Sequence, residues 1–200
     1  TPAAPASEKS VEAIIESLKT GGDPSLGERI YRRPELTCTL CHAIGGVGGK
    51  LGPDLSSIGA SAPVDYIVES VLHPERKVKE GFHAMIYQMA DGTSVVGIPS
   101  RTTATGQFIR TIACEQPIDK SAIRSQEMAG AGGSLMPAGL IDSLTREELA
   151  DLAEQISVLT DDVVIPERDV VMEERRWRTD DKPQSKVNEQ FQAIAFRTHP

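Results

Sequence analysis

The chain has 200 residues, of which 21 are basic and 29 acidic, so its formal charge at pH 7 is −8. This length suits one domain of ordinary size with an appendage, and the acidic balance argues against broad nucleic-acid binding. No stretch approaches the roughly 18 uninterrupted apolar residues that a membrane span requires, so no transmembrane span is predicted in this chain.

Apolar residues at helical spacing predict four helices, each with a cap, a glycine pair or a proline at one end. The first is a helical extension within residues 1–22, and the second follows the Asp23-Pro24 cap. The third starts at Pro63, and the fourth follows a capping box that begins at Thr145. The second, third and fourth helices are expected to cover residues 26–33, 63–73 and 146–159.

Two of the three cysteines lie in the sequence Cys38-Thr39-Leu40-Cys41-His42. A C-x-x-C-H motif is typical of covalent haem attachment, in which two thiols add across the haem vinyl groups and the histidine binds the iron. Alternatives are a thioredoxin-like dithiol, half of a zinc site and a structural pair. A dithiol normally follows a strand of a βαβ unit, and a zinc site needs about four ligands; the sequence shows neither. Haem attachment is therefore favoured, and Cys114 is expected to be a buried or half-buried thiol without a redox role.

Between the third and fourth helices, residues 79–126 are predicted to form a small antiparallel β insertion. Apolar and polar residues alternate there, and an Asp-Gly pair predicts the turn after the first strand. The expected strands cover 82–89, 93–98 and 107–114, with 118–126 as an open fourth. The predicted fold class is therefore mainly α, with this insertion placed after the third helix.

Three further segments accompany the motif: residues 27–31 ahead of it, 52–55 after it, and Ser134-Leu135-Met136-Pro137 just ahead of the last predicted helix. Together with the motif, these segments resemble class I c-type cytochromes. The run also resembles, more closely, the haem-binding domain of planctomycete and verrucomicrobial proteins, through residues 52–59, 69–74, 91–92 and 134–140. The resemblance covers about residues 23–159 and implies a cytochrome c fold, with the β insertion between the third helix and the methionine loop.

The resemblance also implies a role for five residues. Cys38 and Cys41 would carry the thioether bonds of one covalently bound haem c, His42 would be the proximal iron ligand, and Met136 the distal one. Pro53 would pack on the haem and direct a backbone carbonyl at the ring N–H of His42, which makes the imidazole more electron-donating.

Other sulfur and imidazole groups compete for these roles. Met128 is the nearest rival to Met136, but the proline after Met136 makes that loop more rigid and favours Met136. His83 could replace Met136 only if the β insertion folds over the haem. His73 and His199 are expected at the surface or as helix caps.

Residues 160–200 are more densely charged and are expected to form a separate, partly disordered tail. Asp161-Asp162 is predicted to be a linker and 168–178 a charged helix. Residues 166–176 and 188–200 resemble part of an M16-type zinc peptidase, in which Glu174 would match the third zinc ligand. The H-x-x-E-H pair of that family is absent, so the tail is expected to be a fusion remnant or docking arm rather than a protease.

These features predict a monohaem c-type cytochrome that carries single electrons and is not itself an enzyme. Ligation by His and Met leaves no open iron position for a substrate. The expected partner is a redox protein such as a dehydrogenase or an oxidase, and the resemblance implies a periplasmic or other extracytoplasmic location. Two alternatives stay open: the electron-accepting haem module of a dehydrogenase complex, and a haem-based small-ligand sensor or peroxidase whose methionine dissociates.

Overall fold

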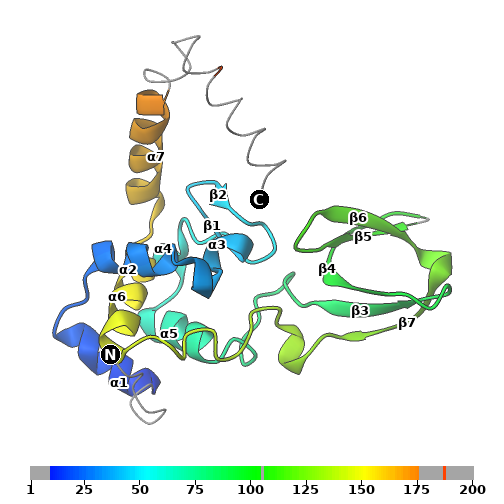
Figure 1. The fold of residues 1–200 in the computed structure, drawn as a ribbon, viewed down its shortest axis with the longest axis horizontal. Helices are drawn as coiled ribbons and strands as arrows, with labels where there is room; N and C mark the ends of the chain where they lie inside the picture. Colours follow the sequence, from blue (N-terminus) through cyan, green and yellow to red (C-terminus); the bar gives the residue numbers. More distant parts are fainter. Residues whose placement is uncertain (1–9, 105, 176–186, 188–200) are drawn as a thin grey trace. The chain divides into compact units, whose positions relative to one another are not determined.

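The computed structural model of the chain describes residues 10–104, 106–175 and 187. The chain divides into two compact units, Thr1–Thr160 and Asp161–Pro200. Among the described residues, the first unit contains all strands and all helices except α7 (Figure 1). In the same residues, no helix is long and apolar enough to cross a membrane.

Four helices of the first unit pack around its main apolar core: α1 (Val11–Lys19), α2 (Pro24–Tyr31), α5 (Val64–Leu72) and α6 (Arg146–Ser157). The sequence predicts each of the four, and the observed ends differ by a few residues. Asp23 caps α2, and Thr145 forms the predicted capping box with Glu148 at the start of α6. The buried core between these helices consists of Ile14, Ile30, Tyr31, Leu36, Ile67, Val68, Ile141, Leu144, Leu149, Ala150, Leu152, Ala153 and Ile156.

The crossing of α2 and α6 depends on a glycine. Gly27 is buried, and a Cβ atom at this position would lie only 2.1 Å from the carbonyl oxygen of Asp151 in α6. A hydrogen bond of 2.8 Å also joins the two helices, from the backbone N–H of Asp23, the N-cap of α2, to Oδ1 of Asp151 in the middle of α6. Any side chain at Gly27 would therefore force the helices apart.

The chain between α2 and α5 contains short elements. They are η2 (Pro34–Leu36), α3 (Cys38–Cys41), β1 (Ala43–Ile44), β2 (Val47–Gly48) and α4 (Ile58–Ser61). β1 and β2 pair as an antiparallel hairpin directly after His42. α3 is a single helical turn that carries both cysteines of the motif. This segment therefore presents four of the five predicted site residues, all except Met136, on short, tightly turned backbone.

A five-stranded antiparallel sheet follows α5 in the chain. Its strands are β3 (Met85–Met89), β4 (Ser94–Thr102), β5 (Gly106–Arg110), β6 (Glu115–Asp119) and β7 (Ile123–Met128), in the order β6-β5-β4-β3-β7. The short helix η3 (Lys120–Ala122) joins β6 to β7, and η4 (Ala131–Gly133) follows β7.

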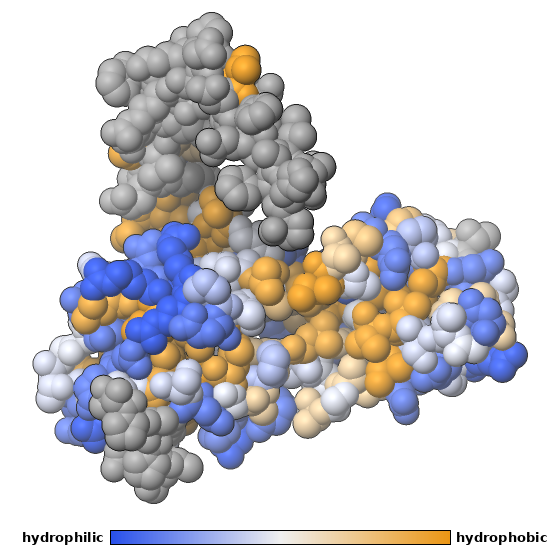
Figure 2. Space-filling model, viewed as in Figure 1, coloured by the Kyte–Doolittle hydropathy of each residue, from blue (hydrophilic) through white to orange (hydrophobic). Residues whose placement is uncertain are grey.

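The sheet is strongly curled around a small core of its own. One buried cluster contains Tyr87 of β3, Ile109 of β5 and Ile118 of β6. Because β3 and β6 are not neighbours in the sheet, the sheet must bend to bring these side chains together. A register shift in β4 between Pro99 and Arg101 marks a bulge, which increases the bend. Figure 2 shows apolar side chains gathered between the two halves of this sheet.

The expectation of a mainly α fold is wrong. The five-stranded sheet and the β1–β2 hairpin make this a mixed α/β fold. Residues 107–114 do not form one strand, because β5 ends at Arg110 and a tight turn closes on Cys114. Residues 118–126 are divided between the end of β6, η3 and β7. The edge strands lack clear alternation, since β6 contains Pro117 and β7 is almost entirely exposed, so their pattern predicts little.

The second unit contains α7 (Asp161–Arg175). The linker expected at Asp161-Asp162 is wrong, since these residues begin the helix. Two carboxylates in the first turn interact favourably with the positive end of the helix dipole. Glu174 lies in α7, but its side chain is outside the described residues, as are residues 188–200 with His199.

Candidate functional site

An apolar cavity of about 210 Å³ lies in the first unit between its helices and the nearest part of the sheet. Its wall is drawn from many segments of the chain: α2, α3, the loop after β2, α5, the segment from Lys77 to Phe82, β4, the residues from Ser134 to Ile141, and α6. The five residues that the sequence singles out all line this cavity: Cys38, Cys41, His42, Pro53 and Met136. Residues up to 98 positions apart in the chain are therefore brought to one site.

His42 is held in a defined orientation. Its Nδ1 lies 2.8 Å from the carbonyl oxygen of Pro53. Because a carbonyl only accepts hydrogen bonds, Nδ1 must carry the proton, which leaves Nε2 with a free lone pair. Burial lowers the pKa of His42 below its ordinary value, although the hydrogen bond to Pro53 opposes this effect. The imidazole is therefore kept neutral, which is the form that binds metal ions.

Gly52 allows the histidine ring to sit against the loop. A Cβ atom at Gly52 would lie 2.6 Å from Cε1 of His42 and 2.8 Å from Nδ1. The backbone N–H of Gly52 also donates to the carbonyl of Cys41 at 2.8 Å, which ties this loop to the end of α3. The glycine ahead of Pro53 is thus a steric requirement of the His42–Pro53 contact.

The two cysteines of the motif are free thiols in the cavity wall. Thr37, directly before α3, has φ 53°, which is an uncommon backbone conformation for a β-branched residue and turns the chain sharply into Cys38. Burial raises the pKa of both Cys38 and Cys41. Redox-active dithiols need a lowered pKa, so this environment argues against the thioredoxin-like alternative.

The zinc alternative has no support in the described residues. Within 10–104 and 106–175, no group of three or more His, Cys, Asp or Glu side chains could hold a metal ion. Cys38, Cys41 and His42 themselves do not form such a group.

Met136 lies on a short loop whose backbone is held by its neighbour. Its N–H donates to Oγ of Ser134 at 3.2 Å, and Pro137 follows it in the cavity wall. The rival Met128 lies on the edge strand β7, with 52% of its surface exposed, and is not a lining residue. Of the two sulfur atoms, only that of Met136 belongs to a residue of the cavity.

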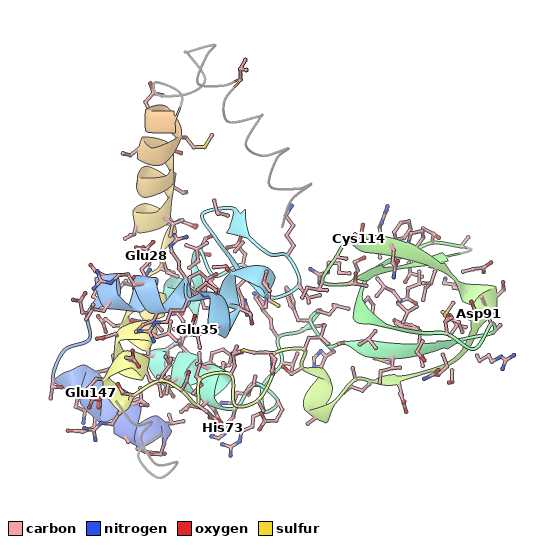
Figure 3. The ribbon with its side chains drawn as sticks, viewed as in Figure 1. Glu28, Glu35, His73, Asp91, Cys114 and Glu147 are labelled. Atoms are coloured by element: carbon pink, nitrogen blue, oxygen red, sulfur yellow. The ribbon has the colours of Figure 1, made fainter. Side chains whose placement is uncertain are left out.

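The other candidates from the sequence lie elsewhere. His73 is the C-terminal cap of α5, and His83 precedes β3; neither lines the cavity. Figure 3 labels His73 below α5 and Cys114 at the end of the sheet, in the turn between β5 and β6. Cys114 is exposed, so the expectation of a buried or half-buried thiol is wrong.

Sequence reasoning does not identify Tyr31 as a site residue, although it lies one helical turn after Gly27 on the same face of α2. Its hydroxyl donates to the backbone carbonyl of His42 at 3.0 Å, and its ring lines the cavity. Only 3% of Tyr31 is exposed. Burial, with a smaller contribution from Cys38, raises the pKa of Tyr31 to about 12. The phenol therefore remains a hydrogen-bond donor throughout the physiological pH range.

The β insertion also contributes to the cavity. Ile98 of β4 and Phe82, which precedes β3, both line it. Ile98, Leu51 and Ala84 form a second buried cluster, against which Cys41 packs. The inserted sheet is therefore part of the wall beside the cysteine motif.

No protein-family model and no curated protein matches this chain.

Proposed function

We propose that this protein is a monohaem c-type cytochrome that carries single electrons. The observation that carries the proposal is the shared cavity: both thiols of the C-x-x-C-H motif, the imidazole of His42 and the thioether of Met136 border one apolar space. Histidine and methionine are the ligand pair of electron-transferring c-type haems.

The cavity has the chemical character that a haem requires. Its wall is formed mainly by aliphatic and aromatic side chains, among them Leu51, Val71 and Leu140. Apolar surroundings exclude water from a large flat ring. The polar lining residues include the motif itself, the hydroxyls of Thr37, Ser70 and Ser134, and the side chains of Lys77 and Lys79. The lone pair on Nε2 of His42 is available because Nδ1 is engaged with Pro53. The residues present therefore fit this group.

Each of these residues has a distinct role in the proposal. Cys38 and Cys41 would each add a sulfur–hydrogen bond across a vinyl group, so that two thioether bonds form without an external oxidant or reductant. His42 and Met136 would supply the two protein ligands of the iron, while the Pro53 carbonyl and the Tyr31 hydroxyl fix the position of His42. When bound, the haem iron exchanges one electron between its ferrous and ferric states.

This function also implies a partner and a location. Two protein ligands leave the iron no open position, so the protein would exchange electrons with another redox protein, whether free or as a module of a dehydrogenase complex. Covalent haem attachment of this type takes place outside the cytoplasm, which makes an extracytoplasmic location part of the proposal.

The basic test is whether haem becomes covalently attached. The chain is produced in cells that attach c-type haem, and its absorption spectrum is recorded after denaturation in alkaline pyridine, beside a variant in which Cys38 and Cys41 are both alanine. Only the unaltered chain is expected to retain haem through denaturation. Absence of covalent haem from the unaltered chain contradicts the proposal. Rapid carbon monoxide binding by the native reduced protein would instead favour a small-ligand sensor.

Met136→Ala tests the ligand assignment, with Met128→Ala as its matched control. Loss of the thioether should leave both covalent bonds intact, admit carbon monoxide and lower the reduction potential by about a tenth of a volt or more, since axial ligands move haem potentials over about 0.8 V. Met128→Ala should retain the original potential because Met128 is on an exposed edge strand. If only Met128→Ala changes the potential, the assignment to Met136 is wrong.

A further inference from the structure

Two arginines of the inserted sheet stack on phenylalanine rings, and only one of these rings lines the apolar cavity. The guanidinium carbon of Arg110, at the end of β5, is 4.9 Å from the centre of the Phe82 ring. That of Arg101, in β4, is 3.6 Å from the centre of the Phe108 ring. Phe82 lines the apolar cavity, whereas Phe108 does not.

Arg110 also joins two loops that border the cavity. Its Nη1 donates to the carbonyl of Lys50 at 3.2 Å, and its Nη2 donates to the carbonyl of Gly81 at 3.1 Å. Lys50 precedes the cavity residues Leu51 and Gly52, and Gly81 precedes Phe82. One side chain therefore holds together the loop that follows the cysteine motif and the loop that enters the sheet.

Arg110 forms no ion pair within the described residues, although Glu115 lies opposite it across β5 and β6. Its Nε is buried and, among the same residues, has no hydrogen-bond partner. The Glu115 carboxylate instead accepts a hydrogen bond from Oγ of Ser100 and lies 3.8 Å from the guanidinium of Arg101. A cation that is not in ion-pair contact is less screened and acts over a longer range, especially through apolar surroundings of low dielectric constant.

We propose that Arg110 is a positioning residue that raises the reduction potential of the haem, an inference that rests on the proposed function. Its positive charge disfavours the ferric state, which carries one more positive charge than the ferrous state. Its contacts with Lys50, Gly81 and Phe82 also hold two loops of the cavity wall together. A wall fixed in this way would limit the access of water, which disfavours the more highly charged ferric state as well.

Arg101→Gln is the matched control for Arg110→Gln. Both changes remove one arginine charge and one stacking contact from the same sheet, but only Arg110 contacts a residue of the cavity wall. The reduction potentials of the unaltered haem protein and of both variants are measured by redox titration at one ionic strength. At a fixed applied potential, Arg110→Gln is expected to lower the ratio of ferrous to ferric protein about threefold to tenfold, where tenfold corresponds to about 59 mV for one electron. Arg101→Gln is expected to change this ratio less than about twofold.

Arg110→Lys separates the charge from the planar contacts. An ammonium retains the charge but cannot donate to both carbonyls in the same fork geometry. The reduction potential of Arg110→Lys should therefore lie between those of the unaltered protein and Arg110→Gln. If Arg110→Gln does not fold with haem, the reduction potentials of Arg110→Lys and Arg101→Lys are compared instead. Only Arg110→Lys should lower the potential.

Equal potentials in the Arg110 and Arg101 variants, with haem present in all of them, overturn this inference and leave the proposed function intact. Absence of covalent haem from the unaltered chain overturns both. The two failures are therefore distinguishable in the same set of proteins.

Discussion

Tyr31→Phe removes a single oxygen atom from the cavity wall and leaves the ring in place. The hydroxyl donates to the backbone carbonyl of His42 at 3.0 Å, so the variant leaves that carbonyl without this donor. A neutral hydrogen bond contributes about 0.5–1.5 kcal/mol, and a buried acceptor left without a partner costs about 1–3 kcal/mol. Because the bond is only part-buried, we expect a loss of about 1–2 kcal/mol in the free energy of unfolding.

The measurement is guanidinium chloride unfolding of the haem-bearing protein, with Tyr66→Phe as the control. Tyr66 also lines the cavity, but within the described part of the chain its hydroxyl has no hydrogen-bond partner. Tyr66→Phe removes the same atom and should change the free energy of unfolding by no more than about 0.5 kcal/mol. Equal losses in the two variants would refute the importance of the Tyr31–His42 hydrogen bond.

The difference in the free energy of unfolding between the unaltered protein and Tyr31→Phe should also depend on pH. Burial raises the pKa of Tyr31 from 10.0 to about 12, so the folded protein holds the phenol proton more tightly than the unfolded chain does. The resulting stabilisation is present below pH 10 and is lost as the pH rises from 10 toward 12. The stability advantage of the unaltered protein over Tyr31→Phe, measured as the free energy of unfolding, should therefore shrink from pH 10 to 12. A constant difference in this free energy would contradict the reasoning.

Two glycine substitutions test the packing that supports the site, with Gly106→Ala as a common control because its added Cβ would meet no atom closer than 3.4 Å. Gly27→Ala places a Cβ atom 2.1 Å from the Asp151 carbonyl oxygen. It should lower the free energy of unfolding by about 3 kcal/mol or more, despite the better helix propensity of alanine. A loss below about 1 kcal/mol would show that α2 and α6 separate easily. Gly52→Ala places a Cβ atom 2.6 Å from Cε1 of His42, so the ring should move away from the Pro53 carbonyl. The reduced protein should then bind carbon monoxide more readily. An unchanged carbon monoxide titration would show that the loop absorbs the added methyl group.

Local patterns in the sequence were sufficient for the helices and for the chemical candidates. Caps and apolar periodicity at Asp23 and Thr145 depend on residues within one or two turns, so they predict α2 and α6 without knowledge of the rest of the chain. The C-x-x-C-H motif is equally local, since its spacing alone brings Cys38, Cys41 and His42 onto one turn.

The sheet was harder to predict because its outer strands carry weak signals. An inner strand such as β3 has an alternating pattern and a following Asp-Gly turn, whereas β7 is exposed along most of its length. Exposed edge strands need no regular apolar face, so periodicity cannot identify them. For this reason the sequence predicts fewer strands than the sheet contains, and the mainly α fold class is wrong.

Only the tertiary structure places Met136 in the cavity with His42 and leaves Met128 on the sheet edge, since both methionines lie close together in the sequence. It likewise joins Tyr31 to the His42 carbonyl and Arg110 to the loops at Lys50 and Gly81. Such contacts connect residues distant in the chain, and their formation depends on how whole helices and strands pack, which no short sequence pattern encodes.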